Sequence, residues 1–268
     1  MTRHDGSGRQ ARLCRGAAFT LAVALAGACA TAPLHPVTEV RRPVENDVIF
    51  LERDGHRIQV DIYQPNEGGR RPAVLVLHGS GGIHHLVGRH EVFRYAESLA
   101  EQGMIAFVVH YFDATGDFTA NDSVETSNYF HWVRELNDIV TRVRARADVQ
   151  ANSIGILGHS LGAWLAVGAA AMDPRINRIV LFGAGLEPFL PDSIRRMPPT
   201  LMFHGDKDDV VPLSDADTLA AFMHRRNYPL EYHVVPGEGH VFADSAATEA
   251  LTHAGRFLAP QRRRSSGR

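Results

Sequence analysis

A serine lies between two glycines in the pentapeptide Gly158-His159-Ser160-Leu161-Gly162. Residues 153–157 before it predict a short buried strand, and the alanine-rich residues 163–171 after it predict a helix. A serine at such a corner is typical of a nucleophile elbow, in which a tight turn lifts the hydroxyl off the sheet. The glycines make room where a Cβ would clash with the neighbouring strand and helix. The alternative role for Ser160 is an ordinary helix N-cap, where serine is favoured.

A serine hydroxyl becomes a good nucleophile when a histidine takes its proton and a carboxylate orients that histidine. Two predicted strands downstream, 200–205 and 230–236, each lead into a loop that carries such groups. Open α/β sheets place their sites on the loops that follow the carboxyl ends of strands. The candidates on these two loops are Asp206, Asp208, Asp209 and His240.

A glycine-rich loop, His78-Gly79-Ser80-Gly81-Gly82, follows the apolar strand predicted at 73–77. The tetrahedral intermediate of acyl transfer needs backbone N–H donors aimed at its oxyanion, and such a loop can supply one of them. We expect this donor to be Ser80, with Gly81 as the alternative. The second donor is expected from Leu161, at the start of the helix after the nucleophile.

Taken in order, these four motifs resemble the α/β-hydrolase superfamily and, within it, the dienelactone-hydrolase-type esterases. The resemblance spans about residues 47–258. It implies that the acid is Asp208, two residues before Val-Val-Pro, and that the base is His240 in the Gly-Glu-Gly-His motif. One departure matters: dienelactone hydrolase itself carries a cysteine nucleophile, whereas this chain has Ser160. The serine favours the broad esterase branch over the lactone reaction that names the family.

The elements that must position these groups alternate between strands and helices. An antiparallel hairpin is predicted at 48–52 and 58–63, turning at Asp54-Gly55. Further strands are predicted at 104–110 and at 176–183, the second of these between the nucleophile strand and the acid strand. Helices are predicted at 90–101, 124–147, 163–172, 214–227 and 245–258. The alternation predicts an α/β class chain with the α/β-hydrolase fold, a mostly parallel central sheet with helices on both faces, in one domain at 47–260.

Several side chains adjoin the motifs. We interpret His159 and His204 as packing groups, with His159 also a candidate for the pocket wall. Tyr111, at the end of the strand 104–110, is expected to line the pocket mouth. Trp164 follows Ser160 by one turn and is expected in the core or, alternatively, in the pocket wall.

No cofactor or metal is predicted. His84, His85 and His90 lack the helical i, i+4 pairing with a nearby acid that zinc proteases use, and a loop beside the pocket explains them. The sequence has neither a dinucleotide-binding Gly-x-Gly-x-x-Gly fingerprint nor a P-loop.

The first 28 residues predict a signal peptide. Four arginines precede an apolar run at 17–28 that is too short and too rich in alanine to favour a bilayer span. The sequence Leu25-Ala26-Gly27-Ala28-Cys29 resembles a bacterial lipoprotein processing site, which would lipidate Cys29, whereas Ala28-Cys29-Ala30 suits ordinary signal cleavage. We therefore expect export, to the periplasm or as a membrane-anchored lipoprotein, with secretion as the alternative. Residues 29–46 predict an irregular tether, and the basic residues 261–268 predict a disordered tail.

The composition limits the classes of partner that the chain can be expected to bind. The formal net charge is −2, and removal of residues 1–28 would change it to −5, which argues against a nucleic-acid partner. Cys14 and Cys29 are the two cysteines, so the processed chain would hold no internal disulfide. We expect a small ester as the partner, and a membrane contact only through a lipid at Cys29. The sequence leaves the oligomeric state undetermined.

The predicted chemistry is acyl transfer to water: a serine hydrolase that cleaves small carboxylic esters or lactones through an acyl-enzyme. Only residues 184–198 join the strand after the elbow helix to the acid strand, where many lipases insert a larger lid. This favours an open site and small substrates, although residues 185–191 could form a small flap. Two alternatives stay open, because a fold and a nucleophile do not choose the acceptor. One is a peptidase or acyltransferase on the same triad, and the other is a non-catalytic exported binding protein.

Overall fold

The computed structural model describes residues 44–66 and 68–260 of the chain. The predicted signal peptide (1–28), the basic tail (261–268) and all but the last three residues of the predicted tether (29–46) lie outside these residues. In the described part of the chain, no helix is both long enough and apolar enough to cross a membrane.

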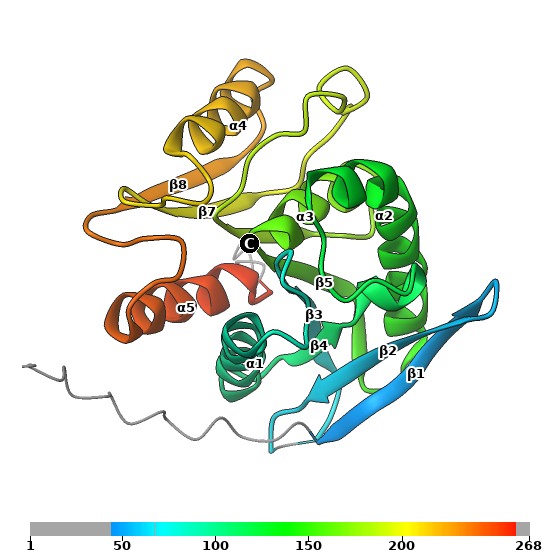
Figure 1. Ribbon diagram of the computed structural model, residues 1–268. Coiled ribbons are helices and arrows are strands. Elements are labelled where there is room, and N and C mark those ends of the chain that lie inside the picture. Colours follow the sequence, from blue (N-terminus) through cyan, green and yellow to red (C-terminus); the bar gives the residue numbers. More distant parts are fainter. Residues whose placement is uncertain (1–43, 67, 261–268) are drawn as a thin grey trace, which may run out of the picture. The chain divides into compact units, whose positions relative to one another are not determined.

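The described residues form an eight-stranded sheet with the strand order β1-β2-β4-β3-β5-β6-β7-β8 (Figure 1). β1 and β2 pair with each other in antiparallel fashion, and β2 pairs antiparallel with β4. Every other pairing is parallel. The strands are β1 Glu45–Arg53, β2 His56–Tyr63, β3 Arg71–Leu77, β4 Ile105–Val109, β5 Val149–His159, β6 Arg178–Phe182, β7 Thr200–Gly205 and β8 Leu230–Val235.

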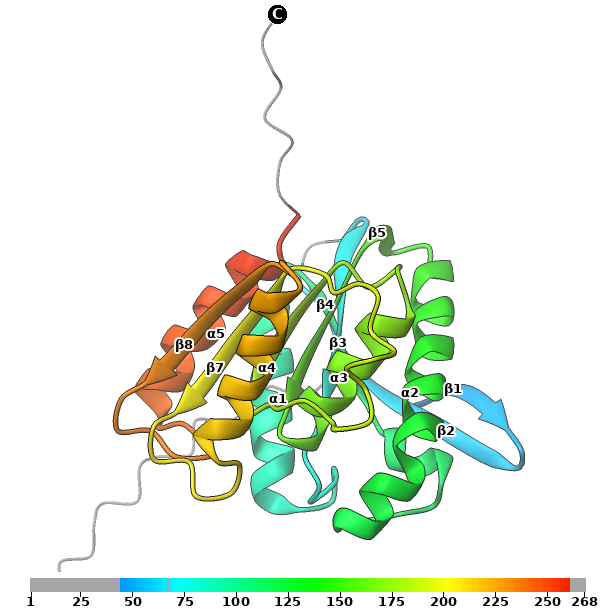
Figure 2. The ribbon, with the colours of Figure 1, turned by 90° about the horizontal axis from the view of Figure 1, so that it is seen from above.

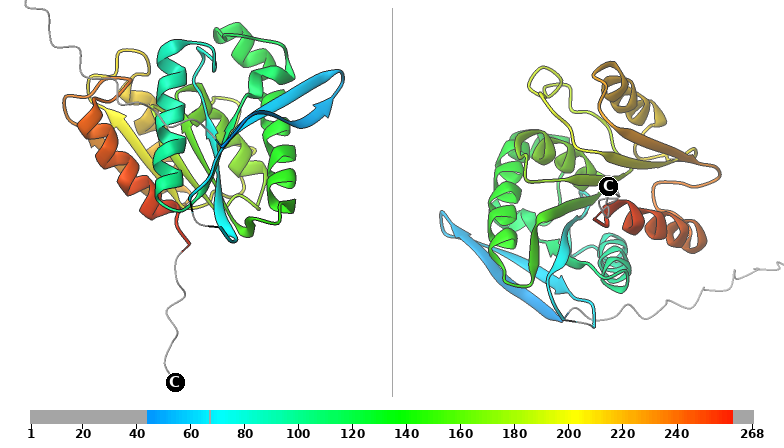
Figure 3. Two further views of the ribbon diagram at one scale, coloured as in Figure 1. Left: turned by 90° about the horizontal axis from the view of Figure 1, so that it is seen from below. Right: turned by 180° about the vertical axis from the view of Figure 1, so that it is seen from behind.

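Helices cover both faces of this sheet (Figure 2). α1 and α5 lie side by side on one face, as both views of Figure 3 show, and α2, α3 and α4 cover the other. The helices are α1 Leu86–Glu101, α2 Asp122–Ala145, α3 Leu161–Met172, α4 Leu213–Arg225 and α5 Asp244–Leu258, with a short 3₁₀-helix η1 at Tyr111–Ala114.

Two apolar layers hold the helices to the sheet because strand side chains alternate between its faces. In β3, Leu75 packs into the layer shared with α2, α3 and α4, whereas its neighbours Val74 and Val76 pack into the layer shared with α1 and α5. All three side chains are buried. The inner strands are therefore apolar on both faces, as expected for a parallel sheet covered by helices.

The predicted fold class is confirmed, and the predicted strands and helices are present with shifted ends. The hairpin turns at Asp54 and Gly55, whose φ angles of 51° and 84° are the positive values that a two-residue hairpin turn requires. The predicted tether is two residues too long, because β1 begins at Glu45, which pairs with Ile62 of β2. Helix α1 begins at Leu86, four residues before its predicted start.

The parallel strands place the four motif loops at one edge of the sheet. The glycine-rich loop follows β3, the elbow follows β5, the aspartates follow β7 and His240 follows β8. Since the carboxyl ends of parallel strands share an edge, all four loops lie along the same edge of the sheet.

Candidate active site

Ser160 occupies a sharp turn between β5 and α3. Its φ of 53° and ψ of −127° are unusual for a residue other than glycine, and its N–H donates a hydrogen bond of 2.9 Å to the carbonyl oxygen of Phe182. A Cβ on Gly162 would lie 2.6 Å from the carbonyl oxygen of Leu77, and one on Gly158 would meet the backbone of Gly162. Ser160 makes no side-chain capping bond to α3, so the ordinary N-cap interpretation is wrong. The geometry is that of a nucleophile elbow.

His240 pairs with Asp208. The Nδ1 atom of the imidazole lies 2.9 Å and 3.1 Å from the two carboxylate oxygens. The Asp208 side chain is 1% exposed and that of His240 is 14% exposed, so solvent scarcely screens the contact. Of the other two candidate aspartates, Asp206 accepts a hydrogen bond from the N–H of Gly237, and Asp209 is exposed.

The turn after β7 holds the carboxylate of Asp208 in place. One carboxylate oxygen accepts hydrogen bonds from the N–H groups of Val210 and Val211, at 2.9 Å and 2.8 Å. Burial alone would raise the pKa of Asp208, but the hydrogen bonds from His240 and the two N–H groups outweigh it, so the pKa lies below its ordinary value. An ionised Asp208 requires the hydrogen of a neutral His240 to sit on Nδ1, which leaves Nε2 as the free base.

Two further histidines contact this pair or the backbone around it. His159 Nε2 lies 3.0 Å from the carbonyl oxygen of His240, and the two rings have centroids 4.8 Å apart. His204 Nε2 donates to the carbonyl oxygen of Val211 at 2.9 Å and lies 3.5 Å from Asp208 Oδ2. Both side chains are buried, in keeping with the packing role expected from the sequence. His159 is not among the residues that line the cavity beside Ser160, so the structure gives its alternative role as a wall residue no support.

The end of β6 brings the elbow and the imidazole together. Gly183 follows Phe182, the residue whose carbonyl oxygen binds the N–H of Ser160. Gly183 has a φ of 60°, and a Cβ there would lie 3.1 Å from Cε1 of His240 and 3.5 Å from Oδ2 of Asp208. The backbone of one glycine therefore packs directly against the His240–Asp208 pair.

A cavity of about 350 Å³ opens beside Ser160. Its lining includes two of the expected oxyanion donors, Ser80 and Leu161, but not the alternative Gly81. In the described part of the chain, no acceptor takes the N–H of Ser80 or that of Leu161. Trp164 also lines this cavity, which agrees with the wall position rather than the core position.

The expectation for Tyr111 is wrong. Its side chain is completely buried, its hydroxyl donates to the carbonyl oxygen of His78 at 2.8 Å, and its ring stacks on that of His78 with centroids 4.0 Å apart. The chain turns into η1 immediately after β4, and this turn directs Tyr111 inward. The tyrosine therefore supports the glycine-rich loop and does not contact the cavity.

Sequence reasoning missed most of the cavity wall, which is strongly acidic. Asp122 and Glu125 lie in the first turn of α2, which Asn121 caps through two hydrogen bonds. Asp215 comes from the first turn of α4, and Glu187 from the connection between β6 and β7. Three short segments that are distant in the sequence thus contribute four carboxylates. The only signal in the sequence is the clustering of acids in helix first turns, which helix dipoles favour anyway.

Burial raises the pKa of two of these carboxylates. Burial raises the pKa of Glu187, and burial followed by the charges of Asp122 and Glu187 raises the pKa of Glu125. In the described part of the chain, none of the four carboxylates accepts a side-chain hydrogen bond or forms an ion pair. The wall therefore presents negative charge that no protein group balances.

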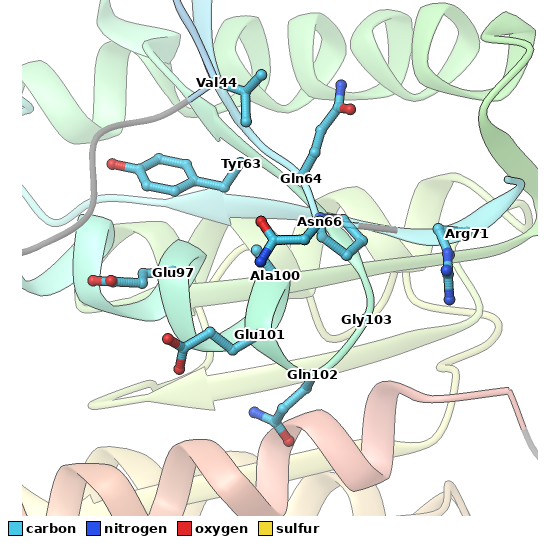
Figure 4. A pocket seen from close by; sticks show the side chains of 11 residues that line it. Val44, Tyr63, Gln64, Asn66, Arg71, Glu97, Ala100, Glu101, Gln102 and Gly103 are labelled. Carbon is cyan, nitrogen blue, oxygen red and sulfur yellow. The ribbon is translucent and has the colours of Figure 1, made fainter. Parts of the chain in front are cut away.

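Other polar groups lie away from this site. Two sets of side chains have the composition of a metal site, Glu231 with His233 and His253, and Asp47 with Asp61 and His110. Each set is already linked by hydrogen bonds or ion pairs among its own members. A second cavity, of about 590 Å³, lies near the amino ends of β3 and β4 (Figure 4). Parallel sheets bind ligands at the opposite edge.

Comparisons with known proteins place the chain in a family. Residues 58–256 match the model of the dienelactone hydrolase family. A probable 2-oxo-3-(5-oxofuran-2-ylidene)propanoate lactonase from Bradyrhizobium sp. is 30% identical over 217 residues, which cover 73% of this chain and 83% of the lactonase.

Solved structures share the fold at lower identity. Dienelactone hydrolase from Anabaena variabilis is 20% identical with a TM-score of 0.60, covering 81% of this chain and 98% of that one. Esterase 2 from Thermogutta terrifontis, phosphonylated by cyclosarin, is 20% identical with a TM-score of 0.64, covering 81% of this chain and 94% of that one. The match over most of the described residues shows that this chain belongs to the dienelactone hydrolase family and is a carboxylic ester hydrolase.

Proposed function

We propose that the chain is a serine hydrolase that cleaves small carboxylic esters or lactones through an acyl-enzyme, with Ser160, His240 and Asp208 as its triad. The observation that carries this proposal is the pairing of His240 Nδ1 with the buried carboxylate of Asp208, on the loop edge where Ser160 forms a nucleophile elbow. Asp208 and His240 supply an oriented base, and the elbow supplies a hydroxyl that lines a cavity.

The proposed reaction has two halves. In the first, the Ser160 oxygen attacks the ester carbonyl carbon while His240 Nε2 takes the hydroxyl proton. The C–O bond to the alcohol then breaks, and the imidazolium gives its proton to the departing oxygen. In the second half, His240 takes a proton from a water while that water attacks the carbonyl carbon of the acyl-enzyme. The bond between the acyl carbon and the Ser160 oxygen then breaks, the imidazolium of His240 returns the proton to Ser160, and the carboxylic acid product leaves. Asp208 stays ionised throughout and stabilises the imidazolium.

The oxyanion of each tetrahedral intermediate needs donors that no protein acceptor already uses. We assign these to the N–H groups of Ser80 and Leu161, which line the cavity. Leu161 is the first residue of α3, where backbone N–H groups have no partner within the helix. The loss of one such donor typically costs about 10²–10³ in rate.

The substrate is proposed to be small. Residues 183–199, between β6 and β7, contain neither a helix nor a strand, so no helical lid covers the cavity from this connection. A lactone is one candidate because a relative is described as a lactonase, although the name of its substrate includes an anionic propanoate group. Simple esters are the other candidate, and the serine nucleophile favours them.

The decisive experiment uses purified protein and p-nitrophenyl acetate. Ser160→Ala should lower kcat by about 10⁴-fold or more while the circular dichroism spectrum stays unchanged. A fluorophosphonate probe should label the unsubstituted protein at Ser160 and fail to label the variant. Turnover at the original rate by Ser160→Ala would overturn the proposal.

The same triad serves peptidases and acyltransferases. A panel of esters, lactones and peptides, with and without an added alcohol acceptor, separates these activities from ester hydrolysis. We expect hydrolysis of short esters to dominate. Release of amines from peptides at a comparable kcat/KM would favour the peptidase alternative, and a transesterified product would favour the acyltransferase.

We also propose that the protein acts after export, in the periplasm or as a lipoprotein anchored at Cys29. This part of the proposal rests on the sequence of residues 1–29 alone.

A further inference from the structure

The cavity beside Ser160 is built to hold a ligand. The Ser160 residue is 8% exposed and lines the cavity, and in the described part of the chain its hydroxyl has no hydrogen-bond partner. The position of the nucleophile thus fixes the cavity as the place where the ester sits.

The wall of that cavity carries four carboxylates from three segments: Asp122, Glu125, Glu187 and Asp215. Among the residues that the structure describes, no lysine, arginine or histidine lines it. A concave site lined by charges of one sign concentrates ligands of the opposite sign, because its low-dielectric walls screen the field poorly. An anionic ester would meet repulsion here, whereas a cationic ester would meet attraction.

Helix dipoles do not account for the whole set. Asp122, Glu125 and Asp215 occupy helix first turns, where a carboxylate is stabilised without any ligand. Glu187 belongs to no helix, is half-buried, and has neither an ion pair nor a side-chain hydrogen bond within the described residues. Burial of an unpaired carboxylate costs free energy, and a ligand cation in the cavity would offset that cost.

An aromatic surface accompanies the charges. Trp164 lines the same cavity, and the absence of a side chain at Gly185 lets its ring pack closely there, because a Cβ at that glycine would meet the indole. Carboxylates together with an indole are the groups that attract ammonium ions, by charge and by cation–π contact.

We propose that the enzyme selects esters that carry a permanent positive charge, such as a quaternary ammonium group, and that Glu125 and Glu187 determine this selectivity. The inference rests on the proposed function of Ser160. The substrate proposed here is a cation. The substrate named for the Bradyrhizobium relative is a propanoate and therefore an anion.

The test compares isosteric esters that differ only in charge. On the acyl side, p-nitrophenyl 4-(trimethylammonio)butanoate is compared with p-nitrophenyl 5,5-dimethylhexanoate. On the alcohol side, butyrylthiocholine is compared with its carbon isostere, 3,3-dimethylbutyl thiobutyrate. We expect kcat/KM to favour the cationic member of at least one pair by about tenfold at low salt, and this ratio to fall in about 0.5 M NaCl.

Variants then locate the charge that is responsible. Glu125→Gln and Glu187→Gln keep the side-chain shape, and each should lower the cationic-to-neutral ratio by up to about fivefold, the size expected for a partly exposed ion pair. Glu249→Gln, on the exposed face of α5, removes the same charge away from the cavity and should leave the ratio and the basal activity unchanged.

The outcomes separate the two proposals. If unsubstituted enzyme hydrolyses the neutral esters as fast as the cationic ones, or if the two glutamine variants keep the full ratio, the charge selectivity is overturned and the serine mechanism stands. If Ser160→Ala retains turnover of the neutral esters, the mechanism itself fails. The salt dependence needs no variant, so it tests the inference even if a glutamine substitution unfolds the protein.

Discussion

His159 Nε2 lies 3.0 Å from the carbonyl oxygen of His240, so the residue before the elbow serine is hydrogen-bonded to the backbone of the proposed base. Burial, followed by the charge of His240, lowers the pKa of His159 to about 4. The ring is therefore neutral near pH 7, and the contact requires its hydrogen on Nε2. We propose that His159 positions His240 and takes no part in the proton transfer itself.

His159→Ala should lower kcat about tenfold to a hundredfold, because misplacement of a catalytic group by 1 Å can cost that much. KM should change less, since His159 does not line the cavity. His159→Gln keeps an N–H donor near the position of Nε2 and should recover part of the rate. Steady-state kinetics on p-nitrophenyl acetate measure both values. An alanine variant with unchanged kcat would show that the contact does not position His240.

Asp208→Asn should lower kcat by about 10⁴-fold, because an amide no longer selects the imidazole tautomer with its hydrogen on Nδ1. The matched control is Asp209→Asn, one residue further along and exposed, which should change kcat by less than about twofold. The same ester assay compares them. A larger loss of kcat in the Asp209 variant than in the Asp208 variant would show that Asp209, and not Asp208, is the catalytic acid.

Gly183→Ala should lower both stability and activity. Its φ of 60° costs an alanine about 1–2 kcal/mol, and the new Cβ would lie 3.1 Å from Cε1 of His240. Gly237→Ala is the control, since its φ is 83° and nothing lies within 4 Å of an added Cβ. Urea unfolding should show a similar loss of stability in both variants. Only the Gly183 variant should also lose kcat, and equal rates would refute a contact between β6 and the imidazole.

Motifs whose chemistry depends on neighbours in the sequence were predictable. The elbow around Ser160 needs glycines on either side in the chain, so a short pattern indicates it. The turn that holds Asp208 is closed by the next three residues, but the choice of Asp208 over Asp206 and Asp209 came from the family resemblance. The mostly parallel sheet with helices on both faces followed from the alternation of strands and helices, because parallel neighbours need a crossover connection, usually a helix.

Features that depend on distant segments were not predictable. Tyr111 ends an apolar strand, and nothing local shows that η1 directs its ring under His78. Likewise, Asp122 and Glu187 look like ordinary surface acids until α2 and the connection after β6 meet over the elbow. Tertiary packing brings these two segments together, and the sequence of either segment alone does not indicate that the other lies beside it.

Cys29 offers a test of the proposed export. If the site is lipidated, labelled palmitate should be incorporated and the protein should fractionate with membranes. Cys29→Ala should then lose the label and the membrane association, because a lipid chain supplies most of the anchoring free energy. Cys14→Ala is the control, since this residue lies within the predicted signal peptide. If the protein is instead soluble in the periplasm, unlabelled and cleaved next to Cys29, the signal peptide is removed by ordinary cleavage and Cys29 is not lipidated.

Two buried histidines link stability to pH. Burial lowers the pKa of His78 to about 3 and is also the largest cause of the lowered pKa of His159, about 4. In the unfolded chain both would titrate near 6.5. Between these values the unfolded state binds more protons than the folded state, so stability falls as the pH falls.

We therefore expect the free energy of unfolding to decrease below about pH 6.5 by up to about 1.4 kcal/mol per pH unit for each of these histidines. The contribution of His159 should level off near pH 4 and that of His78 near pH 3. Urea unfolding at about pH 7 and about pH 5 measures the slope. His159→Gln removes one titrating group and should flatten it by the equivalent of one proton. His224→Gln, on the exposed face of α4, should leave it unchanged. A His159 variant with the original slope would mean that this imidazole is protonated in the folded protein.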